Sequence, residues 1–169
     1  TDRQGRVWGV GTAGWGLTGG GVSWINPDTG EAGTARLPGS PYTIAELQPG
    51  TLLMADEATV RWWDSGTNTE RATCAWPHGS TPAAVALTGV QAGMIAFCDA
   101  QGLHLARLPA PGKLEIKQSF PLPIDTTRLL WDGRRLIAGG RGIAELDPAT
   151  GQWTKLCDTG PAQPYAFVA

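Results

Sequence analysis

Lysine, cysteine and long apolar runs are all scarce in this chain of 169 residues. Its three lysines are Lys113, Lys117 and Lys155, and the formal net charge is −2. No basic stripe therefore points to nucleic acid or to an anionic membrane surface. No run approaches the roughly 20 apolar residues that a membrane-spanning helix needs. The sequence predicts neither a nucleic-acid partner nor membrane insertion.

The three cysteines, Cys74, Cys98 and Cys157, are an odd number at wide spacing, without a Cys-x-x-Cys pair. This pattern favours buried free thiols over one disulfide with a leftover cysteine. It indicates a reducing compartment such as the cytoplasm. The opening residues lack an initiator Met and an apolar signal core, so we expect a processed or excised product.

Glycine and proline are abundant, with 24 Gly and 13 Pro, while 17% of residues are charged and 41% are hydrophobic. The chain is too rich in loop-forming residues for a helical bundle and too apolar for a disordered polymer. Its length suits one domain, or part of one, with a substantial core. We therefore expect many short strands joined by turns.

One pattern recurs along the chain. Residues 21–30, 59–68 and 142–151 align without a gap, and residues 102–109 begin a fourth copy. The apolar anchors of the copies follow one another at steps of 38, 43 and 40 residues: Val22, Val60, Leu103 and Ile143. A repeat of this length is typical of an array of supersecondary units.

Each anchor lies in a strand-like stretch with similar neighbours. An apolar strand precedes it, and another follows its turn. A third stretch lies further upstream, as at residues 42–47, 83–87 and 127–131. The preceding strands are expected at 14–17, 51–55, 94–98 and 135–138, and the following ones at 32–37, 70–76, 114–120 and 152–156. The sequence thus predicts four short strands per repeat.

Two short segments make the class of repeat more specific. Residues 60–64 resemble the strand ending of a WD repeat, and residues 146–153 resemble the strand–turn–strand of quinoprotein-like or kelch-type blades. Four antiparallel strands about every 40 residues resemble the blades of WD-repeat, quinoprotein-like and regulator-propeller proteins. The resemblance implies an all-β β-propeller segment spanning residues 1–169, with about four four-stranded antiparallel blades. Their approximate bounds are 6–38, 41–77, 82–121 and 125–158.

The chain does not end on a blade boundary. Residues 164–168 repeat the character of residues 41–45, so 164–169 is expected to be the first strand of a next blade. We therefore expect an incomplete propeller that another segment or chain completes. The alternative is that the last strand closes the first blade of a four-bladed ring.

The tripeptide Asp28-Thr29-Gly30 matches the motif that carries the catalytic carboxylate of aspartic proteases. The repeat places Gly66 and Ala149 at the position of Asp28, so no carboxylate recurs there. An Asx residue at the turn entry and Gly or Asn at its end recur instead, which is hairpin-turn chemistry. The recurring entry residues are Asn26, Asp64 and Asp147. We predict turns and no protease.

Residues 9–14 formally fit the G-x-G-x-x-G dinucleotide fingerprint, but residues 15–21 are too rich in glycine for the helix that this fingerprint requires. We predict a turn between the first two strands of a blade. His78 and His104 lack the spacing of a local zinc motif and are expected to be surface or core residues. No catalytic residue, cofactor or metal ligand is predicted.

Eight tryptophans are many for this length. Trp24, Trp62 and Trp153 fall within repeated strands and are expected to pack. Exposed aromatic and apolar residues near the chain ends and turns are candidates for a protein interface. The candidate set is Val7, Trp8, Trp15, Trp63, Tyr165 and Phe167.

The function expected from this organisation is a non-enzymatic scaffold or recognition module, with a protein partner or the remaining blades completing it. The alternative is part of a propeller enzyme or small-ligand sensor, similar to quinoproteins, lactonases or lyases, with a central cofactor or metal. That alternative needs repeated polar ligands near the starts of the innermost strands. Those positions hold Tyr42, Thr43, Thr126, Thr127 and Arg128, which favours binding over catalysis.

Overall fold

The chain is all-β in a computed structural model that describes residues 1–2, 4–12, 20–87 and 93–158. The described residues form fifteen strands and contain no helix. No described segment is therefore a helix that could span a membrane.

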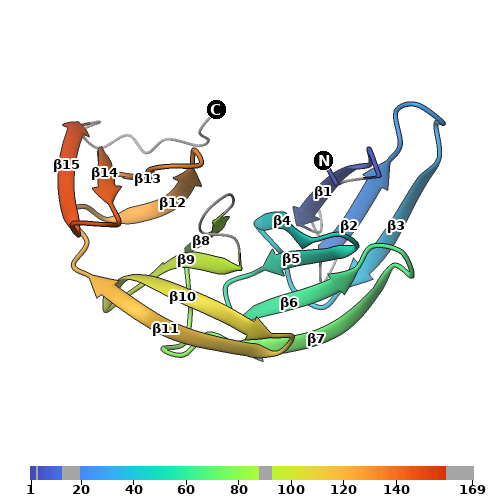
Figure 1. The fold of residues 1–169 in the computed structure, drawn as a ribbon, viewed down its shortest axis with the longest axis horizontal. Coiled ribbons are helices and arrows are strands. Elements are labelled where there is room, and N and C mark those ends of the chain that lie inside the picture. The colour runs from blue at the N-terminus through green and yellow to red at the C-terminus, as the bar shows by residue number, and fades with distance from the viewer. Residues whose placement is uncertain (3, 13–19, 88–92, 159–169) are drawn as a thin grey trace. The chain divides into compact units, whose positions relative to one another are not determined.

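The strands form four sheets, each a meander in which consecutive antiparallel strands pair (Figure 1). The first sheet contains β1 (Val7–Thr12), β2 (Gly20–Ile25) and β3 (Ala32–Leu37). The second contains β4 (Thr43–Gln48), β5 (Thr51–Ala55), β6 (Thr59–Asp64) and β7 (Thr69–Ala75). The third contains β8 (Ala83–Leu87), β9 (Met94–Asp99), β10 (Gly102–Ala110) and β11 (Lys113–Phe120). The fourth contains β12 (Thr126–Trp131), β13 (Leu136–Gly140), β14 (Ile143–Asp147) and β15 (Gln152–Cys157).

The sequence repeat and the sheets coincide. The four anchors lie in β2, β6, β10 and β14, the strands that precede the last strand of each sheet. Three sheets have the predicted four strands, and the first has three within the described residues. The all-β arrangement of blade-like antiparallel sheets is thus confirmed.

The turn predicted at the start of the chain was wrong for residues 9–12. The strand expected at residues 14–17 lies outside the described part, and the described strand that pairs with β2 from the N-terminal side of the chain is β1. Residues 9–12, expected in a turn, pair with β2 in regular antiparallel register. Glycine keeps its backbone N–H and C=O, so Gly9 and Gly11 can join the ladder while Val10 packs into a core.

The hairpin turns after the anchor strands have the predicted chemistry. Asn26 Oδ1 accepts from the Asp28 amide at 3.0 Å, and Asp64 Oδ1 accepts from the Gly66 amide at 2.8 Å. Asp147 Oδ1 accepts from its equivalent amide at 2.9 Å. The closing residues adopt positive φ, at 75° for Gly30, 56° for Asn68 and 73° for Gly151. Asp28 is an exposed turn residue, as the repeat indicated.

The contacts divide the chain into two compact units. Residues 1–79 with 110–113 form the first, and residues 80–109 with 114–169 form the second. The core of the first unit lies between the first and second sheets and contains Val22, Leu37, Leu52, Met54 and Trp63. The core of the second unit joins the third and fourth sheets through residues such as Leu103, Leu105, Leu136 and Leu146.

The packing predictions hold for the repeated tryptophans. Trp62 is buried, Trp24 lies 6.1 Å from Trp8 between ring centroids, and Trp153 packs against the core of the second unit. All three cysteines are free. Burial raises the pKa of Cys98 to about 12, which makes it an inert core thiol. Cys157 is exposed, which corrects the expectation that every thiol is buried.

Candidate functional site

Within the described residues, the first sheet has one strand fewer than the other three. Val10 of β1 pairs with Val22, as Ala55 of β5 pairs with Val60, so β1 is the equivalent of β5. The equivalent strands of the other sheets pair on their far side with an inner strand: β4, β8 or β12. Among the described residues β1 pairs with β2 alone, so its other edge is open (Figure 1).

The hydrogen bonds around β1 show which backbone groups face the open edge. The Asn26 amide donates to the Glu31 carbonyl at 2.7 Å, toward β3. Backbone groups alternate along a strand, so the next residue, Ile25, is hydrogen-bonded to its register partner Val7. Trp8 and Val10 then direct their N–H and C=O groups away from β2. In the second sheet, Ala55 is the equivalent of Val10. The Ala55 carbonyl accepts a hydrogen bond from the Tyr42 amide at 2.9 Å.

The open edge lacks the usual protection against pairing. Its sequence, VWGVGT, has neither a charged residue nor a proline. The outer edge strands β3, β7, β11 and β15 all carry charged side chains, which discourage unwanted strand addition. Two inner strands, β4 and β12, carry Glu46 and Arg128, while uncharged β8 is largely buried. An exposed strand without charge is thus peculiar to β1 among the described edges.

The turn before β1 also matches the complete sheets. Gly5 has a φ of 77° and lies three residues before Trp8. Gly50 and Gly93, at φ of 80° and 84°, lie three residues before the equivalent positions in β5 and β9. In those sheets this turn follows an inner strand. Gly5 thus shares its positive φ with the glycines that follow the inner strands β4 and β8.

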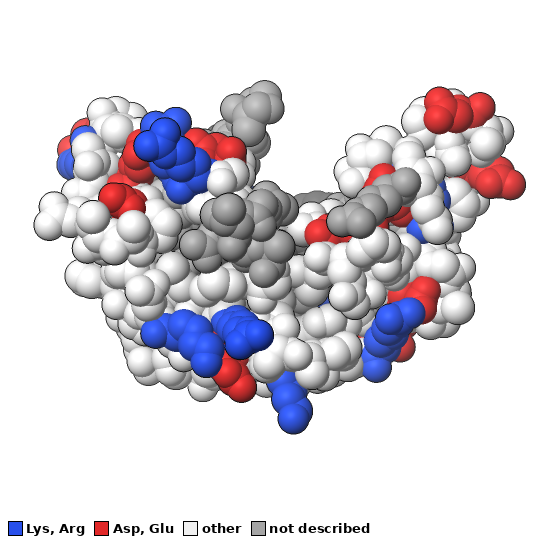
Figure 2. All heavy atoms as spheres, viewed as in Figure 1, with Lys and Arg blue, Asp and Glu red and all other residues white. Residues whose placement is uncertain are grey.

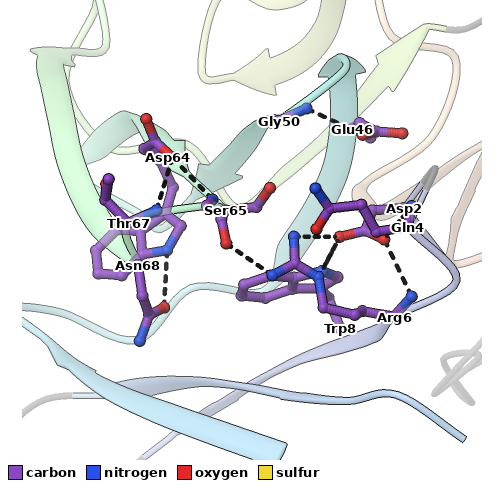
Figure 3. Close-up of polar contacts among 12 residues, drawn as sticks. Asp2, Gln4, Arg6, Trp8, Glu46, Gly50, Asp64, Ser65, Thr67 and Asn68 are labelled. Carbon is purple, nitrogen blue, oxygen red and sulfur yellow. Dashed lines mark hydrogen bonds and ion pairs between the residues drawn. The ribbon is translucent and has the colours of Figure 1, made fainter. Parts of the chain in front are cut away.

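A buried polar cluster fixes the start of β1 (Figure 3). Arg6 donates to Asp2 Oδ2 and to the Ser65 carbonyl, both at 2.8 Å. Trp8 Nε1 donates to the same Asp2 oxygen at 2.8 Å. The guanidinium lies 5.0 Å from the Trp8 ring centroid and 5.3 Å from that of Trp24, within cation–π range. Asp2 and Arg6 thus tie the turn before β1 to the β6–β7 turn.

The charge on Asp2 is held by this cluster. Burial alone would raise the pKa of its carboxyl group, but hydrogen bonds from Trp8 and Arg6 outweigh that effect and lower it. The Asp2 amide donates to the Arg6 carbonyl at 2.9 Å, and Asp2 Oδ1 accepts from the Arg6 amide at 3.0 Å. The backbone of Arg6 is therefore satisfied, and the open edge begins at Trp8.

One face of the first sheet is bare. Val7 and Ile25 are cross-strand partners and are 46% and 48% exposed. Gly9, the next residue along β1 on that face, has open space where a Cβ would lie. The equivalent residues of the second sheet, Leu52 and Met54, are 1% and 0% exposed. The opposite face of the first sheet, with Val10 and Val22, is part of the core.

The predicted interface residues fall into three groups. Val7 is exposed and Trp8 is half-buried, and both lie in β1. Trp63 is buried, and its indole N–H donates to Asn68 Oδ1 at 3.2 Å, so its ring packs in the core of the first unit. Trp15, Tyr165 and Phe167 lie outside the described residues.

A second polar cluster, not anticipated from the sequence, lies in the second sheet. Arg61 donates to Asp56 Oδ2 at 3.2 Å, to Glu70 Oε2 at 2.8 Å and to the Pro38 carbonyl at 2.6 Å. Asp56 also accepts from the Thr59 amide at 2.7 Å. Burial would raise the pKa of Asp56, but its amide and Arg61 hydrogen bonds lower it. This cluster joins β6 to β7 and to the loop before β4.

The third sheet has the corresponding cluster with different residues. His104 Nε2 lies 3.0 Å from Asp99 Oδ1, and His104 Nδ1 lies 2.8 Å from Ser119 Oγ. A serine, an imidazole and a carboxylate in series match the connectivity of a hydrolase triad. The repeat, however, aligns His104 with Arg61, which cannot act as a base. Because the Asp and the basic residue recur five positions apart in both sheets, the arrangement is a structural clamp. The sequence signal for these two clusters was this five-residue spacing between the Asp and the basic residue.

The second unit has an open hollow of about 810 Å³ near the start of β12. Its carboxylates already have cationic or imidazole partners. Asp125 pairs with Arg141 at 3.4 Å, and Asp158 pairs with Lys155 at 2.7 Å. The third, Asp99, belongs to the His104 clamp. These groups do not form an unpaired ligand set of the kind that a central metal or charged cofactor requires.

No protein-family model matches the chain, and no curated protein is significantly similar to it. The surface charges add no strong preference, because acidic and basic side chains are interspersed over uncharged surface on the face shown in Figure 2. The class that the fold defines is an all-β repeat protein of blade-like antiparallel sheets. Its most distinctive site is the open edge of β1.

Proposed function

We propose that the chain is a non-enzymatic scaffold or recognition module of the propeller type, which mediates protein–protein assembly. In this proposal, a β-strand from another segment or chain pairs with β1 and completes the first sheet. The observation that carries the proposal is the absence of a fourth strand beside β1 among the described residues. Strand addition to an open edge is a common mode of protein recognition.

Two further features support strand addition at this edge. The edge has no charge or proline to oppose pairing. Gly5 has the same positive φ as Gly50 and Gly93, which follow inner strands elsewhere in the chain. The propeller enzyme or ligand sensor has less support, because the carboxylates around the hollow in the second unit already have partners.

The test is the solution mass of the full chain by light scattering over a range of concentrations. Val10→Pro removes the N–H that faces the open edge and no hydrogen bond within the sheet. We expect the parent chain to assemble and Val10→Pro to weaken assembly by roughly tenfold, which corresponds to about 1.4 kcal/mol.

Val10→Ala is the matched control, because it keeps the donor and removes methyl groups that pack in the core of the first unit. It should assemble nearly as the parent does. A chain that is monomeric at every concentration, or proline and alanine variants that behave alike, would contradict the proposal.

A further inference from the structure

The repeated clamp explains Asp99 and His104 of the third sheet, but it does not explain Ser119. In the corresponding cluster of the second sheet, the cationic Arg61 donates to the Glu70 carboxylate at 2.8 Å. In the third sheet, the His104 ring lies 2.8 Å from the Ser119 hydroxyl instead. A hydroxyl can donate a hydrogen bond as well as accept one, so this contact offers a chemistry that the clamp does not require.

Asp99 determines which ring nitrogen of His104 acts as the acceptor. His104 Nε2 lies 3.0 Å from Asp99 Oδ1, and a carboxylate accepts hydrogen bonds but donates none. In the neutral imidazole the proton therefore lies on Nε2, and Nδ1 is the acceptor. The Ser119 hydroxyl then donates to Nδ1. A base that accepts from a hydroxyl and is oriented by a third group is the arrangement that activates a serine.

The base is held in place by buried neighbours. His104 is 2% exposed and Asp99 is 8% exposed. Phe97 is the cross-strand partner of His104, and the centroids of the two rings lie 4.9 Å apart. Asp99 Oδ1 also accepts from the Gln101 amide at 2.7 Å, which fixes the carboxylate. The imidazole therefore has one orientation before any ligand arrives.

Ser119 differs from its two partners because it is exposed. It lies near the end of β11, which is the edge strand of the third sheet. Small molecules in solution can therefore reach this residue, while the imidazole and the carboxylate behind it stay buried. An accessible hydroxyl on a buried, oriented base is the geometry of a nucleophile.

We infer that Ser119 is a nucleophile that accepts an acyl group from an activated ester or thioester. Ser119 Oγ attacks the carbonyl carbon, and its proton passes to His104 Nδ1. The bond from the carbonyl carbon to the leaving oxygen or sulfur then breaks, and the leaving group takes that proton. The products are an acyl-serine ester and an alcohol or thiol, and no electrons are exchanged. This modification is stoichiometric, so it goes beyond the proposed scaffold function and does not rest on it.

The test is acetylation of the full chain by p-nitrophenyl acetate, with the modified serines mapped by mass spectrometry. Ser40 is the internal control, because it is also exposed and no imidazole contacts its hydroxyl in the described part of the chain. General-base assistance contributes at least about 100-fold, so Ser119 should be acetylated about 100-fold faster than Ser40. In denaturant the two rates should become similar, because unfolding separates Ser119 from His104.

Two variants assign the roles behind the serine. His104→Gln keeps a polar side chain but removes the base, so acetylation of Ser119 should fall about 100-fold while that of Ser40 stays unchanged. Asp99→Asn tests the positioning role, because an amide can donate to Nε2 and so allows the proton to move to Nδ1. Nitrogen NMR of the imidazole shows which nitrogen carries the proton, and a denaturant titration verifies that each variant is folded.

Three results would overturn the inference. The first is equal acetylation of Ser119 and Ser40 in the folded parent, a comparison that needs no variant to fold. The second is fast acetylation of Ser119 that persists in folded His104→Gln. The third is a proton on Nδ1 of His104 in the parent chain. None of them affects the proposed function, which depends on assembly at β1.

Discussion

The first and second sheets share one repeat and one unit, yet in the described part of the chain the first sheet has one strand fewer and one exposed face. In the second sheet, β5 is buried along its whole length, so both of its faces are covered. In the first sheet, the equivalent strand alternates between half-buried and exposed residues. The same backbone pattern thus supports a finished sheet in one place and an open one in the other.

The side chains on the equivalent faces of these two sheets also differ. The second sheet has Leu52 and Met54 where the first has Val7 and Gly9. Large apolar residues are stabilising only where they are removed from water, at about 25 cal/mol per Å². Gly9 limits the apolar area that this face exposes beside Val7 and Ile25. This composition supports the proposed role of the first sheet as a partner surface.

The largest difference in stability between these sheets is expected on mutation of the buried Asp56–Arg61 ion pair. Asp56→Ala leaves the buried Arg61 without one of its carboxylate partners and removes two amide acceptor contacts. Breaking a buried ion pair costs about 3–5 kcal/mol, so the free energy of unfolding should fall by that order in a denaturant titration. Asp28→Ala, an exposed turn aspartate in the first sheet, should stay within about 0.5 kcal/mol of the parent.

The stability of the Asp56→Ala variant should also depend on pH differently from that of the parent chain. The pKa of Asp56 is lowered in the folded chain, so its contribution is present above its unfolded pKa of about 3.9. That contribution is lost as pH falls through the folded pKa. Below about pH 4 the parent should therefore lose more stability than Asp56→Ala does. If the parent and Asp56→Ala lose stability equally as the pH falls, this role of Asp56 is wrong.

A smaller contrast is expected from the matched apolar residues. Leu52→Ala should lower the free energy of unfolding by about 2–5 kcal/mol, because it removes buried methyl groups and leaves a cavity. Val7→Ala, at the equivalent position of the bare face, should change it by less than about 0.5 kcal/mol in the unassembled chain. Comparable losses at both positions would show that the face of the first sheet is covered within the molecule.

Local sequence chemistry accounts for much of what could be predicted. The strands around Val60 and Leu103 follow from apolar runs between turn residues, and the turns follow from Asn26, Asp64 and Asp147 because an Asx side chain caps amides two or three residues on. The predicted strands at 32–37, 51–55 and 83–87 have the observed bounds of β3, β5 and β8.

Features that depend on long-range pairing were missed. Gly9 and Gly11 were interpreted as turn formers, but the register with β2 holds them in a strand. The Arg61 cluster also draws on Pro38, which lies 23 residues away in sequence, so the local spacing of Asp56 and Arg61 indicates only part of it. The burial of Trp63 likewise depends on the packing of one sheet on another.

Hydrogen exchange at the open edge tests the central claim most directly. The Trp8 and Val10 amides face away from β2, whereas their equivalents in β5, the Leu53 and Ala55 amides, face β4. The account predicts that, under assembly conditions, the Trp8 and Val10 amides exchange about as slowly as those of Leu53 and Ala55, and that dilution below assembly makes them fast. Fast exchange at every concentration would contradict strand addition at β1, and slow exchange at every concentration would contradict its supply by a second chain.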